Sequence, residues 1–258
     1  MKPAMYITTS WDDGHPLDFR VAELLAKFGL TGTFYIPMIA EYETMAAARM
    51  RELSYDFEIG AHTMHHVELT EAPENEARRE IADSKSWVEE NTGSACTMFC
   101  PPRGKYSRRH LDLVQQAGFM GMRTVELMSV DFPRQSAGLA VLPTTLQAHG
   151  HNMSAYVRNA LKRRSLRNLW FCLSHIPSLA NGGDWAGQVR SLLPQALGHG
   201  GVFHLWGHSW EIEKNGQWRQ LEEVFQLLSQ FTRHAPALTN SQICRAVPPG
   251  GLATAIGQ

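Results

Sequence analysis

The sequence lacks the features that would send a protein into or across a membrane. Lys2 leads into a short strand-like run, where a secretory signal peptide would have an apolar stretch and a cleavage site of small residues. No run approaches the ~18 consecutive apolar residues that a transmembrane helix needs. We therefore expect a cytoplasmic protein without a membrane span.

Cysteine and net charge are also scarce. The four cysteines, Cys96, Cys100, Cys172 and Cys244, are widely scattered, and we expect reduced thiols rather than disulfides. The formal net charge is −1, so no excess of basic residues indicates nucleic acid or an anionic membrane surface as a partner. The composition leaves the oligomeric state open.

The chain does have enough apolar residues for one large core. Of its 258 residues, 43% are hydrophobic and 19% are charged, and α/β barrels use ~200–250 residues as a single domain. No Gly/Ser linker, internal repeat or break in composition divides it. We therefore predict one domain over residues 1–258.

Short strand-like runs alternate with helix-like stretches along the chain. The predicted strands are 5–9, 33–36, 58–61, 98–100, 121–123, 169–173 and 202–206. The predicted helices are 17–28, 45–53, 70–90, 107–117, 154–164, 185–196 and 221–231. In the long helix, Thr70 is the expected N-cap and Gly93 follows the end. This alternation is typical of βα units on a parallel sheet, so we predict an α/β barrel or barrel-like sheet with its active site at the carboxyl ends of the strands.

Carboxylate and imidazole side chains follow several of these strands. Asp12 and Asp13 follow the first strand, the run HTMHH (62–66) follows the third, CPPRG (100–104) follows the fourth, and His208 follows the last. Two histidines and a carboxylate are a common zinc set, with coordination positions left open for water and substrate. A bound cation would also make two adjacent carboxylates tolerable, with one as ligand and the other as general base.

Each of these stretches has a simpler explanation when taken alone. Asp-Asp-Gly favours a turn, Pro-Pro is rigid, and a single histidine is more often a core residue than a ligand. Within HTMHH, the spacing allows His62 to act with either His65 or His66. The joint position of all four stretches at one edge of the sheet is what favours a metal-dependent hydrolase.

Taken together, TSWDDG (9–14), HTMHH, FCPPRG (99–104) and HLWGH (204–208) resemble successive motifs of the polysaccharide deacetylases, carbohydrate esterase family 4, which share the domain of chitooligosaccharide deacetylases. The resemblance implies a single-domain distorted (β/α) barrel with a parallel sheet, usually of seven strands. It also implies one divalent metal ion and hydrolysis of N-acetyl groups on amino sugars. Zinc is the metal we expect, with another first-row transition metal as the alternative.

The resemblance also implies a role for each motif residue. Asp13, His62 and His66 would hold the metal, which assigns His65 to the rim of the site. Asp12 would be the general base that takes a proton from the attacking water. His208 would be the general acid that protonates the departing amine.

The third and last motifs supply the predicted substrate contacts. A backbone N–H near Pro101, Pro102 and Arg103 would help to hold the oxyanion, and Trp206 would contact the sugar. Cys100 stands where the family usually has an arginine that orients the general base, and Arg103 is the candidate to reach the base instead. His149, His151 and His175 have no place in the family pattern, and His204 is a candidate for support behind the site.

The predicted substrate is an acylated amino sugar, with an acetyl or formyl group. The missing signal peptide favours a cytoplasmic step in the synthesis of a surface polysaccharide or lipopolysaccharide. Two alternatives stay open: a hydrolase of a non-sugar amide, and a non-catalytic carbohydrate-binding or scaffold protein on the same fold. The main support for the non-catalytic alternative is Cys100.

Overall fold

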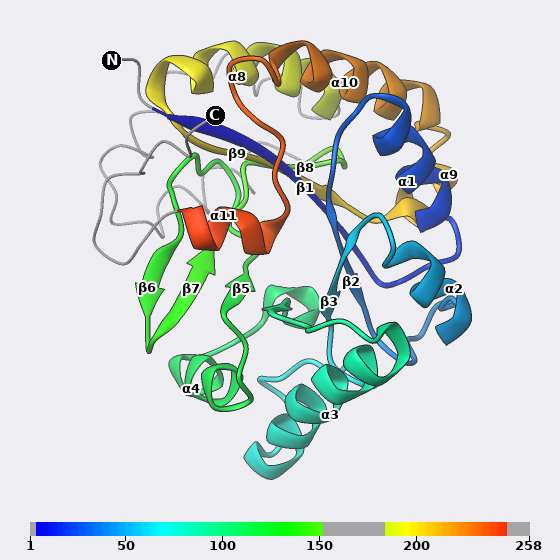
Figure 1. The fold of residues 1–258 in the computed structure, drawn as a ribbon, viewed down its shortest axis with the longest axis vertical. Helices are drawn as coiled ribbons and strands as arrows, with labels where there is room; N and C mark the ends of the chain where they lie inside the picture. Colours follow the sequence, from blue (N-terminus) through cyan, green and yellow to red (C-terminus); the bar gives the residue numbers. More distant parts are fainter. Residues whose placement is uncertain (1–3, 152–183, 247–258) are drawn as a thin grey trace.

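The computed structural model describes residues 4–151 and 184–246. The predicted helix 154–164 and the predicted strand 169–173 lie outside the described residues, as do Cys172 and His175. The described strands form one curled, mostly parallel sheet, a half-barrel with helices packed around it (Figure 1). The predicted α/β barrel-like fold is confirmed, while one domain over residues 1–258 stays a prediction.

The sheet has nine strands in the described residues, rather than the seven expected, in the order β6-β7-β5-β4-β3-β2-β1-β9-β8. Neighbouring strands are parallel except β6 and β7, which are antiparallel. The strands are β1 (Met5–Asp12), β2 (Thr33–Ile36), β3 (Glu58–Ala61), β4 (Met98–Phe99), β5 (Gly121–Arg123), β6 (Arg134–Ser136), β7 (Leu139–Leu142), β8 (Leu146–Gln147) and β9 (Gly201–Gly207).

Helices cover the sheet and close one end of it. They are α1 (Asp18–Lys27), α2 (Ala47–Leu53), α3 (Glu74–Thr92), the short 3-10 helix η1 (Pro102–Gly104), α4 (Arg108–Gln116), α8 (Trp185–His199), α9 (Ser209–Lys214), α10 (Trp218–Phe231) and α11 (Asn240–Ala246). Helix α8 packs on β1, β8 and β9, and α3 packs on β3. Helix α11 contacts β1 and also the neighbouring strands β5 and β7, which are separated from β1 by three strands in the sheet order (Figure 1). Among the described helices, none is both long and apolar enough to cross a membrane.

The central strands could be predicted from the sequence because both faces of the sheet are buried there. All eight residues of β1 are buried, as are all seven of β9, which is expected for parallel strands covered on both sides. The start of α3 was predicted wrongly. This helix begins at Glu74 after Pro73, and the Thr70 hydroxyl donates to Glu68 instead of capping the helix. Gly93 does end it, with a positive φ of 73° that glycine adopts without strain.

The register of the central strands brings the motif residues to one edge of the sheet. Asp12, the last residue of β1, pairs with Tyr35 of β2, and Trp11 pairs with Gly207 at the end of β9. The residues that follow β1 and β9 therefore leave the sheet side by side.

Candidate active site

A pocket of about 430 Å³ opens at this edge of the sheet. The five residues predicted as ligands and catalytic groups all line it, namely Asp12, Asp13, His62, His66 and His208. Arg103 and Trp206 line it as well, whereas Pro101 and Pro102 are buried and do not. Since proline has no N–H, Arg103 is the residue of the three whose backbone can donate to an oxyanion.

Asp13, His62 and His66 form a buried group whose donor atoms lie close enough together to hold a metal ion. Asp13 Oδ1 lies 3.2 Å from His66 Nε2 and 3.6 Å from His62 Nε2. Asp13 and His66 both have positive φ, 80° and 52°, a strained conformation that the surrounding structure has to support. Burial would raise the pKa of Asp13, but hydrogen bonds from both histidines and the charge of His208 outweigh it and hold this pKa well below its usual range.

Both histidines are held with Nε2 toward Asp13 because Nδ1 is already used. The Nδ1–H of His62 donates to the Cys100 carbonyl oxygen at 2.7 Å. The Nδ1–H of His66 donates to Glu41 Oε2, also at 2.7 Å. Outer contacts of this kind fix the tautomer and ring orientation of metal-binding histidines.

His65 turns away from this group. Its Nδ1 lies 2.7 Å from Glu80 Oε1, and its side chain is 53% exposed. The backbone N–H groups of Met64 and His65 both donate to the other oxygen of Glu80, at 2.9 Å. Of the two pairs that the spacing allowed, the structure therefore places His62 and His66 together.

A residue that was not predicted, Arg123, supplies the cation beside Asp12. Its Nη2 donates to Asp12 Oδ1, and both side chains are buried. Burial would lower the pKa of Arg123, but the charge of Asp12 outweighs it and raises this pKa. The expectation that Arg103 reaches Asp12 is wrong. Arg103 is exposed on η1 and its Nη2 donates to Glu41 Oε1 at 2.8 Å.

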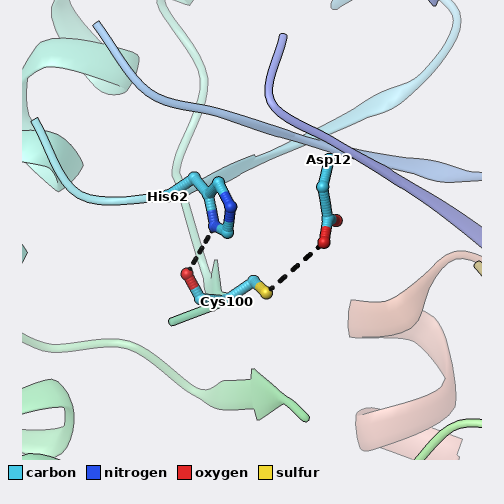
Figure 2. A group of neighbouring side chains, drawn as sticks. All are labelled: Asp12, His62 and Cys100. Atoms are coloured by element: carbon cyan, nitrogen blue, oxygen red, sulfur yellow. Dashed lines mark hydrogen bonds between the residues drawn. The ribbon is translucent and has the colours of Figure 1, made fainter. Parts of the chain in front are cut away.

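Cys100 is an uncharged side chain next to the ion pair of Asp12 and Arg123. Its Sγ lies 4.0 Å from Asp12 Oδ2 (Figure 2). Burial raises the pKa of the Cys100 thiol well above its ordinary value, so the thiol is neutral. Asp12, His62 and Cys100 are close enough to form a second metal group. Since Arg123 already neutralises Asp12 and His62 Nδ1 donates to a carbonyl, the three do not have the free donors or the charge of a separate cation site.

His208 faces the metal group from the end of β9. Its Nε2 lies 3.9 Å from Asp13 Oδ2, and its Nδ1 lies 2.6 Å from Glu211 Oε2. Burial would lower the pKa of His208, but the hydrogen bond to Glu211 and the charges of Asp13 and Asp12 raise it to about 9. The imidazole is therefore protonated at neutral pH and suited to donate a proton.

Aromatic residues form one wall of the pocket. Trp206 is buried, with its ring 4.8 Å from the Arg123 guanidinium and 5.5 Å from the His208 ring. Trp210 donates from Nε1 to Asp13 Oδ2 at 2.9 Å, and Tyr42 stacks on it with ring centroids 4.7 Å apart.

Sequence reasoning did not assign four residues of this wall and its supports: Glu41, Tyr42, Trp210 and Glu211. Only Trp210 and Glu211 carry a signal, because they stand two and three residues after the predicted acid.

Comparison with known proteins supports the same family. Residues 2–122 match the family model described as polysaccharide deacetylase. A candidate polysaccharide deacetylase of Bacillus subtilis, YxkH, is 25% identical over 123 residues, 46% of this chain and 44% of YxkH. The match thus spans less than half the length of this relative.

Solved structures extend the likeness in fold to nearly the whole chain. A candidate polysaccharide deacetylase of Mycobacterium smegmatis superposes with a TM-score of 0.68 at 15% identity, covering 99% of this chain and 96% of that one. A family 4 carbohydrate esterase of Streptomyces lividans, in complex with acetate, has a TM-score of 0.51 at 14% identity and covers 87% and 90%. The predicted resemblance is confirmed.

Proposed function

We propose that this chain, which belongs to the polysaccharide deacetylase family through residues 2–122, is a metal-dependent hydrolase that removes an N-acyl group from an amino sugar. The observation that carries the proposal is the Asp13, His62 and His66 group, with both Nε2 atoms facing one carboxylate oxygen. The proposed base, Asp12, and the proposed acid, His208, line the same pocket.

The donor set fits a divalent metal such as zinc. Zinc bonds of ~2.0–2.2 Å in a tetrahedral arrangement separate ligand atoms by roughly 3.3 Å, close to the 3.2 and 3.6 Å between Asp13 Oδ1 and the two Nε2 atoms. Asp13, His62 and His66 would hold the ion, and another first-row metal is the alternative. When bound, the ion would acidify a water molecule and polarise the acyl carbonyl.

The remaining groups move protons. Asp12, paired with Arg123 and fixed in place by it, takes the proton of the attacking water as general base. His208, protonated at neutral pH, gives a proton from Nε2 to the leaving nitrogen. The backbone N–H of Arg103 is the candidate donor to the oxyanion in the segment 101–103.

The pocket walls suit a sugar ring. Trp206 and the stacked pair Tyr42 and Trp210 offer apolar faces beside the metal group, and aromatic side chains combine such faces with a polar edge. The acyl group we propose is acetyl, in line with the acetate bound to the Streptomyces lividans esterase, with formyl as the alternative. A cytoplasmic step in surface polysaccharide or lipopolysaccharide synthesis stays a prediction from the sequence.

Arg123 weakens the case for a non-catalytic protein. That alternative rested on Cys100 in the place of an arginine, and the base has an arginine partner from another strand. Hydrolysis of a non-sugar amide stays open, and a panel of N-acetylated and N-formylated sugars beside simple amides separates the two.

The first experiment is elemental analysis by inductively coupled plasma mass spectrometry of protein purified without added metal or chelator. About one zinc, or another first-row metal, per chain is expected, and it should be lost in the double variant His62→Ala/His66→Ala. Asp12→Asn should keep the metal and lose release of acetate or formate from the sugar panel. Absence of metal from the wild type, even after reconstitution, contradicts the proposal.

A further inference from the structure

A series of hydrogen bonds runs behind the proposed general acid, on the Nδ1 side of its ring. His208 Nδ1–H donates to Glu211 Oε2 at 2.6 Å, and Glu211 lies in the first turn of α9. The same oxygen accepts from Gln147 Nε2 at 3.1 Å. Gln147 Oε1 in turn accepts from His151 Nε2 at 2.7 Å. Each donor therefore points along the series toward Glu211.

The short strand β8 places these side chains beside the acid. In the parallel register of β8 and β9, Gln147 pairs with Trp206, two residues before the acid. His149 follows two residues later, with Nδ1 3.5 Å from Glu211 Oε1. Both oxygens of the Glu211 carboxylate thus face groups from the segment 147–151, although this segment was not assigned a role from the sequence.

The carboxylate determines which nitrogen of His208 carries the transferable proton. A carboxylate only accepts, so His208 must present Nδ1–H to it. The second N–H of the imidazolium is then on Nε2, which lies on the pocket side, 3.9 Å from Asp13 Oδ2. The rings of Trp206 and Trp210 lie 5.5 and 5.4 Å from the His208 ring, so they fix the place of the ring but not the place of its proton.

We propose that Glu211 is the positioning residue for His208, and that Gln147 holds Glu211 in the orientation this requires. The inference rests on the hydrolase function proposed above. Glu211 acts through His208 by fixing Nδ1–H and stabilising the imidazolium, so that Nε2–H is aimed at the leaving nitrogen. His151 supports the same carboxylate through its hydrogen bond to Gln147, whereas His149 lies near it without a hydrogen bond from Nδ1.

The nature of the leaving group separates this role from a merely structural one. An amine must be protonated as it departs, whereas p-nitrophenolate leaves as a stable anion. Glu211→Gln keeps the shape and one acceptor but removes the charge. It should lower kcat on an N-acetylated chitooligosaccharide by about 100-fold, with KM and the hydrolysis of p-nitrophenyl acetate within about 2-fold of wild type. Gln147→Leu should show the same pattern with a smaller loss, about 10-fold.

Two controls test whether the effect passes through His208. Glu213→Gln, on the same helix but paired with Arg20 and Trp218, should leave both reactions unchanged. Glu211→Gln added to His208→Ala should cause no further loss on the amide. Equal losses on amide and ester, or a further loss in the His208→Ala background, overturn the proposal.

Nitrogen-15 NMR of the histidine side chains tests the arrangement without a substrate. In the wild type, His208 should be protonated on Nδ1, with a downfield and slowly exchanging proton signal. This signal should be absent in His208→Gln and move upfield in Glu211→Gln. A wild type that hydrolyses neither substrate contradicts the proposed function, whereas a His208 signal unaffected by Glu211→Gln contradicts the positioning role.

Discussion

Replacing Arg123 with methionine tests the charge balance at the centre of the site. Methionine fills much of the space between the rings of Tyr35 and Trp206, which lie 5.1 and 4.8 Å from the guanidinium. The change therefore removes mainly the charge and the hydrogen bond to Asp12, and leaves a buried carboxylate without its cation.

The expected loss is large because this ion pair is buried on both sides. Side-chain exposures are 0% for Arg123 and 4% for Asp12, so water cannot screen the charge that is left behind. Removing one partner of a buried pair costs about 3–5 kcal/mol. Since domains are stable by about 5–15 kcal/mol, Arg123→Met should fold but unfold at clearly lower urea concentration.

Urea unfolding followed by tryptophan fluorescence, with chelator present, measures this loss. The matched control is Arg219→Met, which removes an exposed arginine paired with Glu223 and should cost less than about 1 kcal/mol. Asp12→Asn/Arg123→Met should recover part of the loss, because no unpaired charge remains. A cost for Arg123→Met no larger than that of the control would refute the argument that Arg123 is the cation of Asp12.

Three further predictions concern neighbouring groups. Tyr42→Ala removes a ring that is 41% exposed and should raise KM for the sugar several-fold with kcat nearly unchanged, in steady-state kinetics. Glu41→Gln removes the carboxylate that orients His66 and should weaken metal affinity about 10–100-fold, measured by competition with a chelator. Burial, with the charge of Arg123, lowers the pKa of His204 from 6.5 to about 3, so its contribution to stability is complete above pH 6.5 and is lost as the pH falls toward 3. As the pH is lowered from 6 to 4, the unfolding free energy of His204→Gln should therefore fall less steeply than that of the wild type, by up to about 1.4 kcal/mol per pH unit. The control is the exposed histidine variant His234→Gln.

The parts of the fold that could be predicted are those with a continuous apolar pattern. β2 and β3 have the predicted bounds, and β1 extends three residues beyond its predicted end. β6, β7 and β8 were missed although β2, β3, β4 and β5 are equally short, with two to four residues each. No α-helix separates β6, β7 and β8, so the alternation of strands and helices does not reveal them. The six-residue helix α9 was missed because it has fewer than about two turns, too few for an apolar helical period to appear.

The residues of the site also divide into those that could be predicted from the sequence and those that could not. Residues directly after neighbouring parallel strands had to meet at one edge, so Asp12, Asp13 and His208 could be placed together from the sequence. Arg123 could not, because β5 is separated from β1 by three strands in the sheet order. Its contact with Asp12 depends on the curl of the sheet, which brings the two strands face to face across the interior.

The two adjacent carboxylates at the end of β1 are distinguished by what balances their charge. Asp12 has a permanent cation from the chain, since arginine stays protonated at any working pH. Asp13 is paired with no arginine or lysine among the described residues and faces histidine nitrogens and an indole N–H, so the charges around it come only from titratable imidazoles. A divalent ion can therefore take its place beside Asp13, while Arg123 keeps it from Asp12. On this argument Arg123 favours Asp12 as the proposed base and Asp13 as the proposed ligand before any metal binds, and exchanging the two proposed roles would require moving Arg123.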